Sequence, residues 1–317
     1  MSKRTSGRNV HGIILLDKRL GVSSNKALQE VRRLLNANKA GHTGSLDPLA
    51  TGLLPLCFGE ATKVSALMLD DNKRYQVVVQ LGVMTDTGDA EGEVILTKPV
   101  PEYSMASLKA CLQQFVGEID QVPPMYSALK HQGKKLYELA REGITIERKA
   151  RRISIFELNL LENVQTEAGA LGGSDQLVLD VLCSKGTYIR SLAEDIGHAL
   201  GTCGTVKVLR RLEAGQFSIE QAKTIEQLTE MDEQTLFDSL IAVDKPLEFL
   251  PAVQLSEDEA VAIHYGQAIT YPYSSDIDRI ISQGAIRMYH ADVFLGLGEM
   301  GLDGKIAPKK LFNMTNH

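Results

Sequence analysis

The chain has 317 residues, of which 44% are hydrophobic and 23% are charged, and its formal net charge is −6. These values are ordinary for a globular protein, and the length exceeds one typical domain of roughly 100–200 residues. No apolar run approaches the roughly 20 residues of a membrane-spanning helix, and the polar, basic N-terminus is unlike a signal peptide.

The cysteines indicate a reducing compartment. All four lie far apart, without any CxxC or CxxH spacing: Cys57, Cys111, Cys183 and Cys203. This pattern predicts neither disulfides nor a zinc site, and we therefore expect a cytoplasmic protein without membrane association.

Charge is distributed unevenly along the chain. Residues 1–46 carry nine Lys or Arg against two acids, and residues 121–152 carry eight against three. Residues 220–260 carry eleven acids against two Lys. A basic face with an acidic back could neutralise phosphates despite the negative net charge, whereas solvated helix faces would give the same pattern. Composition alone leaves nucleic-acid binding open.

The predicted elements mix strands and helices without strict βαβ alternation. In chain order we expect a buried strand at 11–18, a helix at 23–36, a strand at 75–81, a helix at 104–117, strands at 151–162 and 176–184, and a helix at 187–201. The first helix should begin at a hydroxyl cap and bury one apolar face, formed by Ala27, Leu28, Val31, Leu34 and Leu35. This order predicts an α+β fold with a mixed, largely antiparallel sheet and flanking helices. Residues 167–176 are expected to form a mobile surface loop.

The C-terminal part differs in character from the rest. After Pro246 and Pro251, short strand-like pieces alternate with glycines as far as residue 312. This pattern is typical of a small β-barrel-like module joined by a proline-containing link. We therefore expect two domains, at residues 1–249 and 250–317.

Motif searches disfavour nucleotide, metal and serine-hydrolase chemistry. The sequence contains no GxGxxG, no GxxxxGK[ST], no GxSxG and no histidine pair at metal-ligand spacing. The remaining candidate is the loop GHTGSLDPLATG at 41–52, where Pro48 should keep Asp47 out of helical geometry and the glycines should allow close approach of a ligand. Asp47 could act there as a nucleophile or simply cap a turn, and the loop alone leaves both open.

This loop, read as GHTGSLDPLATGLLP, closely resembles the catalytic motif of the TruB family of pseudouridine synthases, bacterial enzymes that modify the uridine of the tRNA TΨC loop. Ser45 stands where the family often has threonine, and Arg19 stands where it usually has proline. Five further segments match in the family's order and, with the loop, cover most of residues 11–217: LLDKRLGVSSN (15–25), KRYQVVVQLGVMTDTGD (73–89), QVPPMYSALKHQGKKLYELAREG (121–143), CSKGTYIRSLAEDIG (183–197) and VLRRLEAGQF (208–217).

The resemblance implies a catalytic set. Asp47 matches the nucleophile, Arg190 the arginine paired with it, and Tyr75 the active-site tyrosine, whose ring can stack on the uracil. We expect Arg190 to lower the pKa of the Asp47 carboxyl, against burial that would raise it. The isomerisation needs no redox step, so no cofactor and no metal are expected. Attack at the ribose C1′ and attack at the uracil C6 both remain open.

The resemblance also implies how RNA would be held. His42 matches the residue that fills the place of the flipped bases, Tyr188 and Leu209 match residues lining the base pocket, and Lys18 lies near the site. Segment 121–143, with Tyr126 and Lys130 near the site, looks like the family's RNA-gripping segment. The C-terminal module stands where the family carries a PUA-type RNA-binding domain that touches the tRNA acceptor end. The implied partner is tRNA, and no obligate protein partner is expected.

Two alternatives stay in view. One is an RNA-folding chaperone for which modification is incidental, a role that could coexist with catalysis. The other is the guide-RNA-dependent synthase class, which shares the catalytic core but works within a protein–RNA complex.

Overall fold

The computed structural model describes residues 7–161, 164–166, 169–171, 175–271 and 284–314. Its central sheet is formed by β1 (Gly12–Lys18), β2 (Ala40–His42), β3 (Thr51–Phe58), β4 (Lys73–Leu81), β7 (Gly117–Gln121), β10 (Arg151–Leu160), β13 (Gln176–Cys183), β14 (Gly204–Ala214) and β15 (Phe217–Ser218). The helices are α1 (Ser24–Leu34), α2 (Ser65–Leu69), α3 (Met105–Gln113), α4 (Leu136–Arg141), α5 (Ile189–Ala199), α6 (Ile225–Glu230), α7 (Glu233–Asp238) and α8 (Glu257–His264), with short 3-10 turns η1 (Gly59–Lys63), η2 (Ile219–Gln221) and η3 (Lys245–Leu247). None of the helices in this part of the chain is long and apolar enough to cross a membrane.

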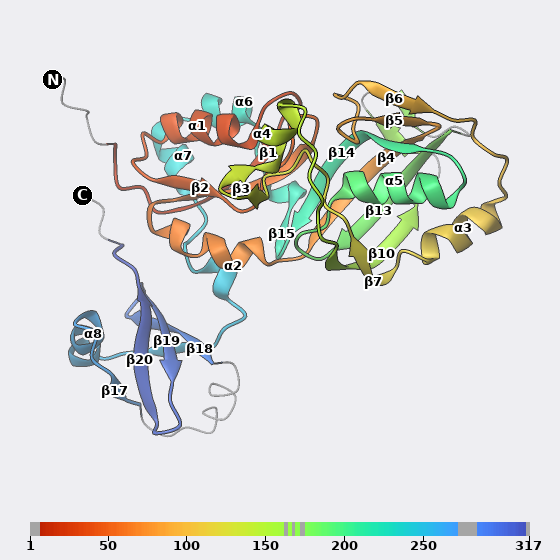
Figure 1. The fold of residues 1–317 in the computed structure, drawn as a ribbon. Helices are drawn as coiled ribbons and strands as arrows, with labels where there is room; N and C mark the ends of the chain where they lie inside the picture. Colours follow the sequence, from red (N-terminus) through yellow and green to blue (C-terminus); the bar gives the residue numbers. More distant parts are fainter. Residues whose placement is uncertain (1–6, 162–163, 167–168, 172–174, 272–283, 315–317) are drawn as a thin grey trace.

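The central sheet is mixed and largely antiparallel, which confirms the predicted fold class (Figure 1). Its main path runs β1–β3–β14–β4–β13–β10–β7, with β2 added to β3 and β15 added to β14. Every pairing within it is antiparallel except that of β3 with β14. Small hairpins join the main strands: β5 (Val83–Thr85) with β6 (Val94–Thr97), β8 (Lys130–His131) with β9 (Lys134–Lys135), and β11 (Val164–Thr166) with β12 (Gly169–Leu171).

The first strand is buried on both faces, as its continuous apolar run predicts. Ile14 and Leu16 pack into the core that includes α1, while Ile13 and Leu15 pack on the other side of the sheet with residues of η1 and α2. Successive side chains of a strand point to opposite faces, so one apolar run serves two cores. The strand thereby anchors both layers around the sheet.

The three predicted helices form, but two of their large apolar side chains are exposed. The Ser23 side chain caps α1 by accepting from the Lys26 amide at 3.2 Å, and the Ser104 side chain caps α3 in the same way. Leu34, however, is 36% exposed, because it borders a groove between α1 and the helices α6 and α7. Met105, in the first turn of α3, is exposed as well.

The loop predicted at 167–176 is wrong at residues 169–171. Residues 167, 168 and 172–174 lie outside the described residues. Gly169–Leu171 pairs with Val164–Thr166 as a strand, so a short hairpin occupies part of the segment. The sequence does not indicate this strand, because glycines and small residues surround it.

The charged segments are not divided between two opposite faces. The acidic helices α6 and α7 pack beside the basic α1 (Figure 1), and an ion pair joins Arg8 to Glu233. The acidic segment 220–260 therefore lies partly against the basic N-terminal segment. At this end of the molecule the two charges compensate each other.

The C-terminal part forms a separate five-stranded sheet below the main body in Figure 1. The order is β16–β18–β19–β20–β17, with the bounds β16 (Ala252–Gln254), β17 (Ile269–Thr270), β18 (Ala285–His290), β19 (Val293–Met300) and β20 (Lys305–Leu311). The sheet curls into a half-barrel with α8 against it, in agreement with the predicted small β module. The domain division at residues 249 and 250 stays a prediction.

The C-terminal sheet contacts the main body through η1. Lys63 Nζ donates to the Leu311 carbonyl at 2.8 Å, and the Asn313 amide donates to the Glu60 carboxylate at 2.9 Å. Phe312 packs in the apolar cluster that holds η1 and α2 against the second sheet. Apolar burial and hydrogen bonds between side chains and backbone groups thus both join the two parts.

Gly52, in the candidate loop, is required by the fold rather than by a ligand. Its φ is +100°, and a Cβ there would lie 2.3 Å from the Arg211 carbonyl oxygen of the parallel neighbour β14. The sequence-based interpretation, that the loop glycines allow a ligand to approach, is therefore wrong at this position. The close approach is between two strands of the protein itself.

Replacing Gly52 with alanine should strongly destabilise the protein. Gly201, at the end of α5, has a similar φ of +81°, but a Cβ there meets only Pro101 at 3.7 Å. Gly201→Ala should cost about 1 kcal/mol from backbone strain alone, whereas Gly52→Ala should cost about 3 kcal/mol or more because the clash adds to it. Urea unfolding of both variants checks this, and equal losses would contradict the clash.

Candidate active site

A cavity of about 340 Å³ opens between the candidate loop, β4, β14 and the start of α5. Five of the predicted site residues line it: Asp47, Tyr75, Tyr188, Arg190 and Leu209. The sheet register brings them together, because β14 pairs with β3 at Gly52 on one side and with β4 at Tyr75 on the other. Segments separated by more than a hundred residues therefore meet at one point.

The backbone around Asp47 is held at three places. The Ala50 amide donates to the Asp47 carbonyl at 3.0 Å, which closes a turn with Pro48 in its second position, where proline is favoured. The buried Ser24 hydroxyl accepts from the Leu46 amide at 2.7 Å and donates to the Leu46 carbonyl at 2.9 Å. Asp47 therefore does begin a turn, and the same turn directs its carboxylate into the cavity.

Lys18 contacts the backbone of the candidate loop and does not line the cavity. Its Nζ donates to the carbonyls of Val22 at 2.7 Å, Arg19 at 3.1 Å and Pro48 at 3.4 Å. Burial lowers the pKa of Lys18 to about 8, although the nearby Asp47 charge opposes this change. The geometry thus gives Lys18 a positioning role for the loop.

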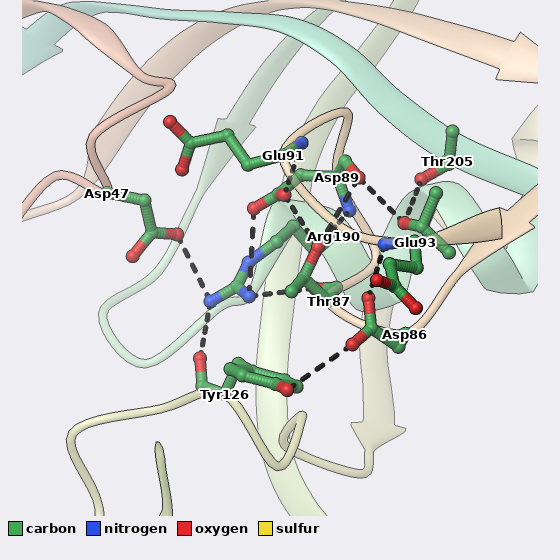
Figure 2. A network of polar contacts seen from close by, with 10 residues as sticks. Asp47, Asp86, Thr87, Asp89, Glu91, Glu93, Tyr126, Arg190 and Thr205 are labelled. Carbon is green, nitrogen blue, oxygen red and sulfur yellow. Dashed lines mark hydrogen bonds and ion pairs between the residues drawn. The ribbon is translucent and has the colours of Figure 1, made fainter. Parts of the chain in front are cut away.

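Arg190 reaches the Asp47 carboxylate from the first turn of α5 (Figure 2). Its Nη2 lies 3.1 Å from Asp47 Oδ2, and the arginine side chain is only 7% exposed. The guanidinium also donates to the Thr87 carbonyl at 2.8 Å and to the Tyr126 carbonyl at 2.7 Å. Because these bonds fix its plane, Arg190 presents a fixed positive charge to the carboxylate.

Burial raises the pKa of the Asp47 carboxyl, and the Arg190 charge offsets only part of the rise. We expected Arg190 to lower this pKa, and it acts in that direction. The second carboxylate, Asp89, opposes it and raises the pKa further. The net shift is therefore upward, so Asp47 loses its charge at a higher pH than an ordinary aspartate does.

Asp89 completes a network that the sequence analysis missed. This buried carboxylate lies 3.9 Å from Arg190 Nη1 and accepts from the Thr87 hydroxyl at 2.7 Å and from the Glu91 amide at 3.1 Å (Figure 2). Asp89 begins a turn in which the Gly92 amide donates to its carbonyl at 3.3 Å. Asp89 does shape that turn, but it also faces the arginine from the side opposite Asp47.

The aromatic residues of the site occupy neighbouring strand and helix ends. Tyr75 lies on β4, and burial raises the pKa of its hydroxyl. Tyr188 stands at the start of α5, where the buried Gln121 accepts from its amide at 2.8 Å and donates to its carbonyl at 3.1 Å. Leu209, from β14, supplies an apolar wall. These side chains provide flat and apolar surfaces around the carboxylate.

His42 lies on β2 and does not line the cavity. Burial and the Arg211 charge lower the pKa of its ring, so the imidazole is neutral at pH 7. Its Nδ1 is buried, and no described residue forms a hydrogen bond with it. The role predicted for His42 stays a prediction, and its place is beside the site rather than in it.

Among the described residues, no group of three His, Cys, Asp or Glu side chains is placed to hold a metal ion. The four cysteines are all buried and free. Cys183 lines the cavity, where burial raises the pKa of its thiol to about 11.

Three family models match the chain in succession. The one described as "TruB family pseudouridylate synthase (N terminal domain)" matches residues 32–189, "tRNA pseudouridylate synthase B C-terminal domain" matches 190–248, and "Pseudouridine synthase II TruB, C-terminal" matches 251–312. A tRNA pseudouridine synthase B of Chromohalobacter salexigens is 47% identical over 316 residues, covering 100% of this chain and 99% of its own length. The chain belongs to the TruB family of pseudouridine synthases.

Another TruB-family relative, the tRNA pseudouridine synthase B of Pseudomonas putida strain F1, is 50% identical over 308 residues and is covered to 96%, as is this chain. Among solved structures, a chain of a Cbf5–Nop10–Gar1 complex superposes with a TM-score of 0.68 at 24% identity, covering 95% of this chain and 84% of that one. At that identity the likeness shows the fold alone. It confirms the pseudouridine-synthase fold predicted from the motifs.

Several residues that hold this TruB-family site escaped the sequence analysis. Ser24 and Asp89 fall within segments quoted for the family resemblance, as do the cavity-lining Lys73 and Arg211. Their positions in those segments were the only available signal, because nothing in their local pattern distinguishes a buried polar residue from a surface one. Arg19, which departs from the family's usual proline, forms a two-bond ion pair with Glu30 of α1 at 3.0 and 3.1 Å.

Proposed function

We propose that this protein isomerises uridine to pseudouridine at position 55, in the TΨC loop of tRNA, with Asp47 as the nucleophile. The observation that carries the proposal is the half-exposed Asp47 carboxylate, held 3.1 Å from the buried Arg190 at the wall of a cavity of suitable size for a base. The names of the relatives described above support tRNA as the substrate. The proposed reaction uses no cofactor, because it is a rearrangement within one nucleotide.

The chemistry requires three changes in the substrate. The C1′–N1 bond breaks, the uracil rotates, and a C1′–C5 bond forms while C5 loses a proton and N1 gains one. An ionised Asp47 can attack either C1′ or C6, and Arg190 keeps a positive charge beside it. Tyr75 offers a ring for stacking and a hydroxyl near the reacting base.

Recognition of a stacked loop uridine requires base flipping. We propose that the neutral, half-buried ring of His42 occupies the place of the flipped bases, because a flat uncharged ring can stack there. The segment 121–143 is proposed to grip the RNA, and its Tyr126 carbonyl already contacts Arg190. The C-terminal half-barrel is proposed to contact the acceptor end of the tRNA, and the reaction is proposed to take place in the cytoplasm without an obligate protein partner.

A tRNA-folding activity is a separate candidate that could accompany catalysis. The fixed Asp47–Arg190 pair argues against a protein that only binds RNA, since a carboxylate beside phosphates weakens binding. The guide-RNA-dependent class is disfavoured because the chain matches a tRNA pseudouridine synthase B along its whole length.

Incubation with unmodified tRNA tests the proposal. The wild-type protein alone should produce pseudouridine at position 55, and replacing that uridine with cytidine in the transcript should remove all product. Pseudouridine mapping after chemical labelling gives the readout. Tight tRNA binding without product would favour the chaperone alternative.

Binding to tRNA should weaken steeply as salt rises. Phosphate contacts by Lys and Arg release counterions, so the logarithm of the binding constant should fall linearly with the logarithm of the salt concentration. Filter binding between low and physiological salt measures the slope. A flat response would exclude the proposed basic contact surface.

A further inference from the structure

Arg211 is a fully buried arginine without an acidic partner. It is 1% exposed and is, by volume, the largest fully buried side chain among the described residues. Its Nε donates to the Leu53 carbonyl at 2.7 Å, and its Nη2 donates to the Gly44 carbonyl at 3.1 Å. No carboxylate of the described residues forms an ion pair with it.

Neighbouring arginines of the same sheet are paired differently. Arg210, the preceding residue of β14, forms a two-bond ion pair with Asp17 at 2.7 and 3.0 Å. Arg74, on β4, pairs with Asp180 and Glu157. A buried charge that only carbonyls satisfy is costly, and the cost falls when a negative charge arrives beside it. Arg211 is therefore a candidate to meet such a charge.

The position of Arg211 specifies where the charge would arrive. The β14–β4 register sets Arg211 opposite Tyr75, and both side chains line the cavity that holds Asp47. The guanidinium acts on the Tyr75 hydroxyl, since its charge and hydrogen bonding lower the pKa of that group against the effect of burial. A positive charge thus lies behind the aromatic surface on which the base would stack.

The reaction creates negative charge on the uracil by either route. When the C1′–N1 bond breaks, its electron pair goes to N1 and is delocalised onto O2 and O4. When a nucleophile adds to C6 instead, the electron pair moves through the ring onto O4. A fixed cation in a water-poor site stabilises such charge strongly, because it needs no reorganisation as the charge develops.

We propose that Arg211 stabilises the negative charge that develops on the uracil during glycosidic cleavage, acting through the hydroxyl of Tyr75. The proposal rests on the proposed function, since it requires the uridine in this cavity. Arg211 is in this sense a positioning residue: it orients and polarises the Tyr75 hydroxyl, which faces the base. The uracil loses this charge when C5 bonds to C1′ and the bond to Asp47 breaks, which returns the electron pair to the carboxylate. C5 then releases a proton and N1 takes one, so no other reactant is needed.

The test compares two substrates in single-turnover reactions. Arg211→Lys and Arg211→Met are assayed on a tRNA containing uridine at the target position and on one containing 5-fluorouridine. Loss of the original nucleoside, measured after nuclease digestion, is the readout for both. Because fluorine withdraws electrons and stabilises the uracil anion by itself, the 5-fluoro substrate should depend less on Arg211.

On uridine, Arg211→Met should slow the reaction by about 100-fold, with unchanged tRNA binding, and Arg211→Lys should lose less because it keeps the charge. On 5-fluorouridine, the loss should be about tenfold smaller. Arg210→Met is the matched control, a neighbouring arginine outside the cavity, and it should leave both rates unchanged. In a Tyr75→Phe background, Arg211→Lys should add little further loss, because the two residues act as a unit.

Three outcomes would overturn the proposal: equal losses on both substrates, full additivity of the Tyr75 and Arg211 changes, or a loss explained by weaker tRNA binding. Each would show that Arg211 only supports the loop and β3. If Arg211→Met does not fold, Arg211→Lys and the double variant still decide the question. An inactive wild type would instead refute the proposed function itself.

Discussion

Asp47→Asn should abolish pseudouridine formation while tRNA binding survives. The substitution keeps the size of the side chain and the turn closed by the Ala50 amide, but an amide is not a nucleophile. Removing a group that forms the covalent bond should lower the rate by about 10⁴-fold or more. Pseudouridine mapping on unmodified tRNA and filter binding on the same preparation give the two readouts.

The control for this experiment is Glu157→Gln, which makes the same chemical change at an exposed carboxylate of β10 outside the cavity. This variant should retain wild-type activity. Equal product from wild type and Asp47→Asn would refute the nucleophile assignment. Loss of tRNA binding in Asp47→Asn would instead indicate that the loop had lost its shape.

Arg190→Met should lower both activity and stability, and should move the pH profile. The ionised form of Asp47 is needed for attack, so activity is lost as pH falls through the pKa of that carboxyl. Burial already raises this pKa, and Arg190 opposes the rise. Without the arginine the pKa rises further, so the acid side of the rate profile should shift to higher pH. Single-turnover rates measured across pH 4–8 would show this shift.

The stability loss has a separate cause. Arg190 is almost fully buried between Asp47 and the buried Asp89, and it satisfies two backbone carbonyls. Removing one member of such a buried set should cost about 3 kcal/mol or more. Arg190→Lys, which keeps the charge without the planar fork, should recover the pH profile better than the stability. An unchanged acid limb in Arg190→Met would contradict the electrostatic role.

Local sequence patterns were sufficient for four strands of the central sheet and three helices, because short-range physics sets them, whereas β3 and β14 were not predicted. The apolar run at 12–16 became a strand buried on both faces, and Ser23 became the cap of α1. The loop glycines and Pro48 marked a sharply turned segment, and the structure shows such a turn at Asp47. Leu34 deviates because the groove toward α6 and α7, which the helix pattern does not encode, leaves it partly open.

Site membership was predicted by resemblance rather than by pattern. Asp47, Tyr75 and Arg190 do line one cavity, whereas Lys18 supports the loop and His42 lies beside the site. The role of Asp89 was not predicted, since a turn pattern does not reveal which buried cation the carboxylate will face. The neighbour of the acidic segment was not predicted either, because helix packing sets it.

The sequence by itself determined four strands of the central sheet, three helices, the hydroxyl cap of α1, the sharply turned loop around Asp47 and, through ordered motifs, the family. Tertiary structure alone decided which polar groups are buried and what each of them contacts. The Arg211 side chain bonds to the carbonyl of Leu53, 158 positions away along the chain, and its backbone makes glycine necessary at position 52. Such contacts depend on the register between strands that lie far apart in the sequence. The residues on either side of a given position do not determine that register.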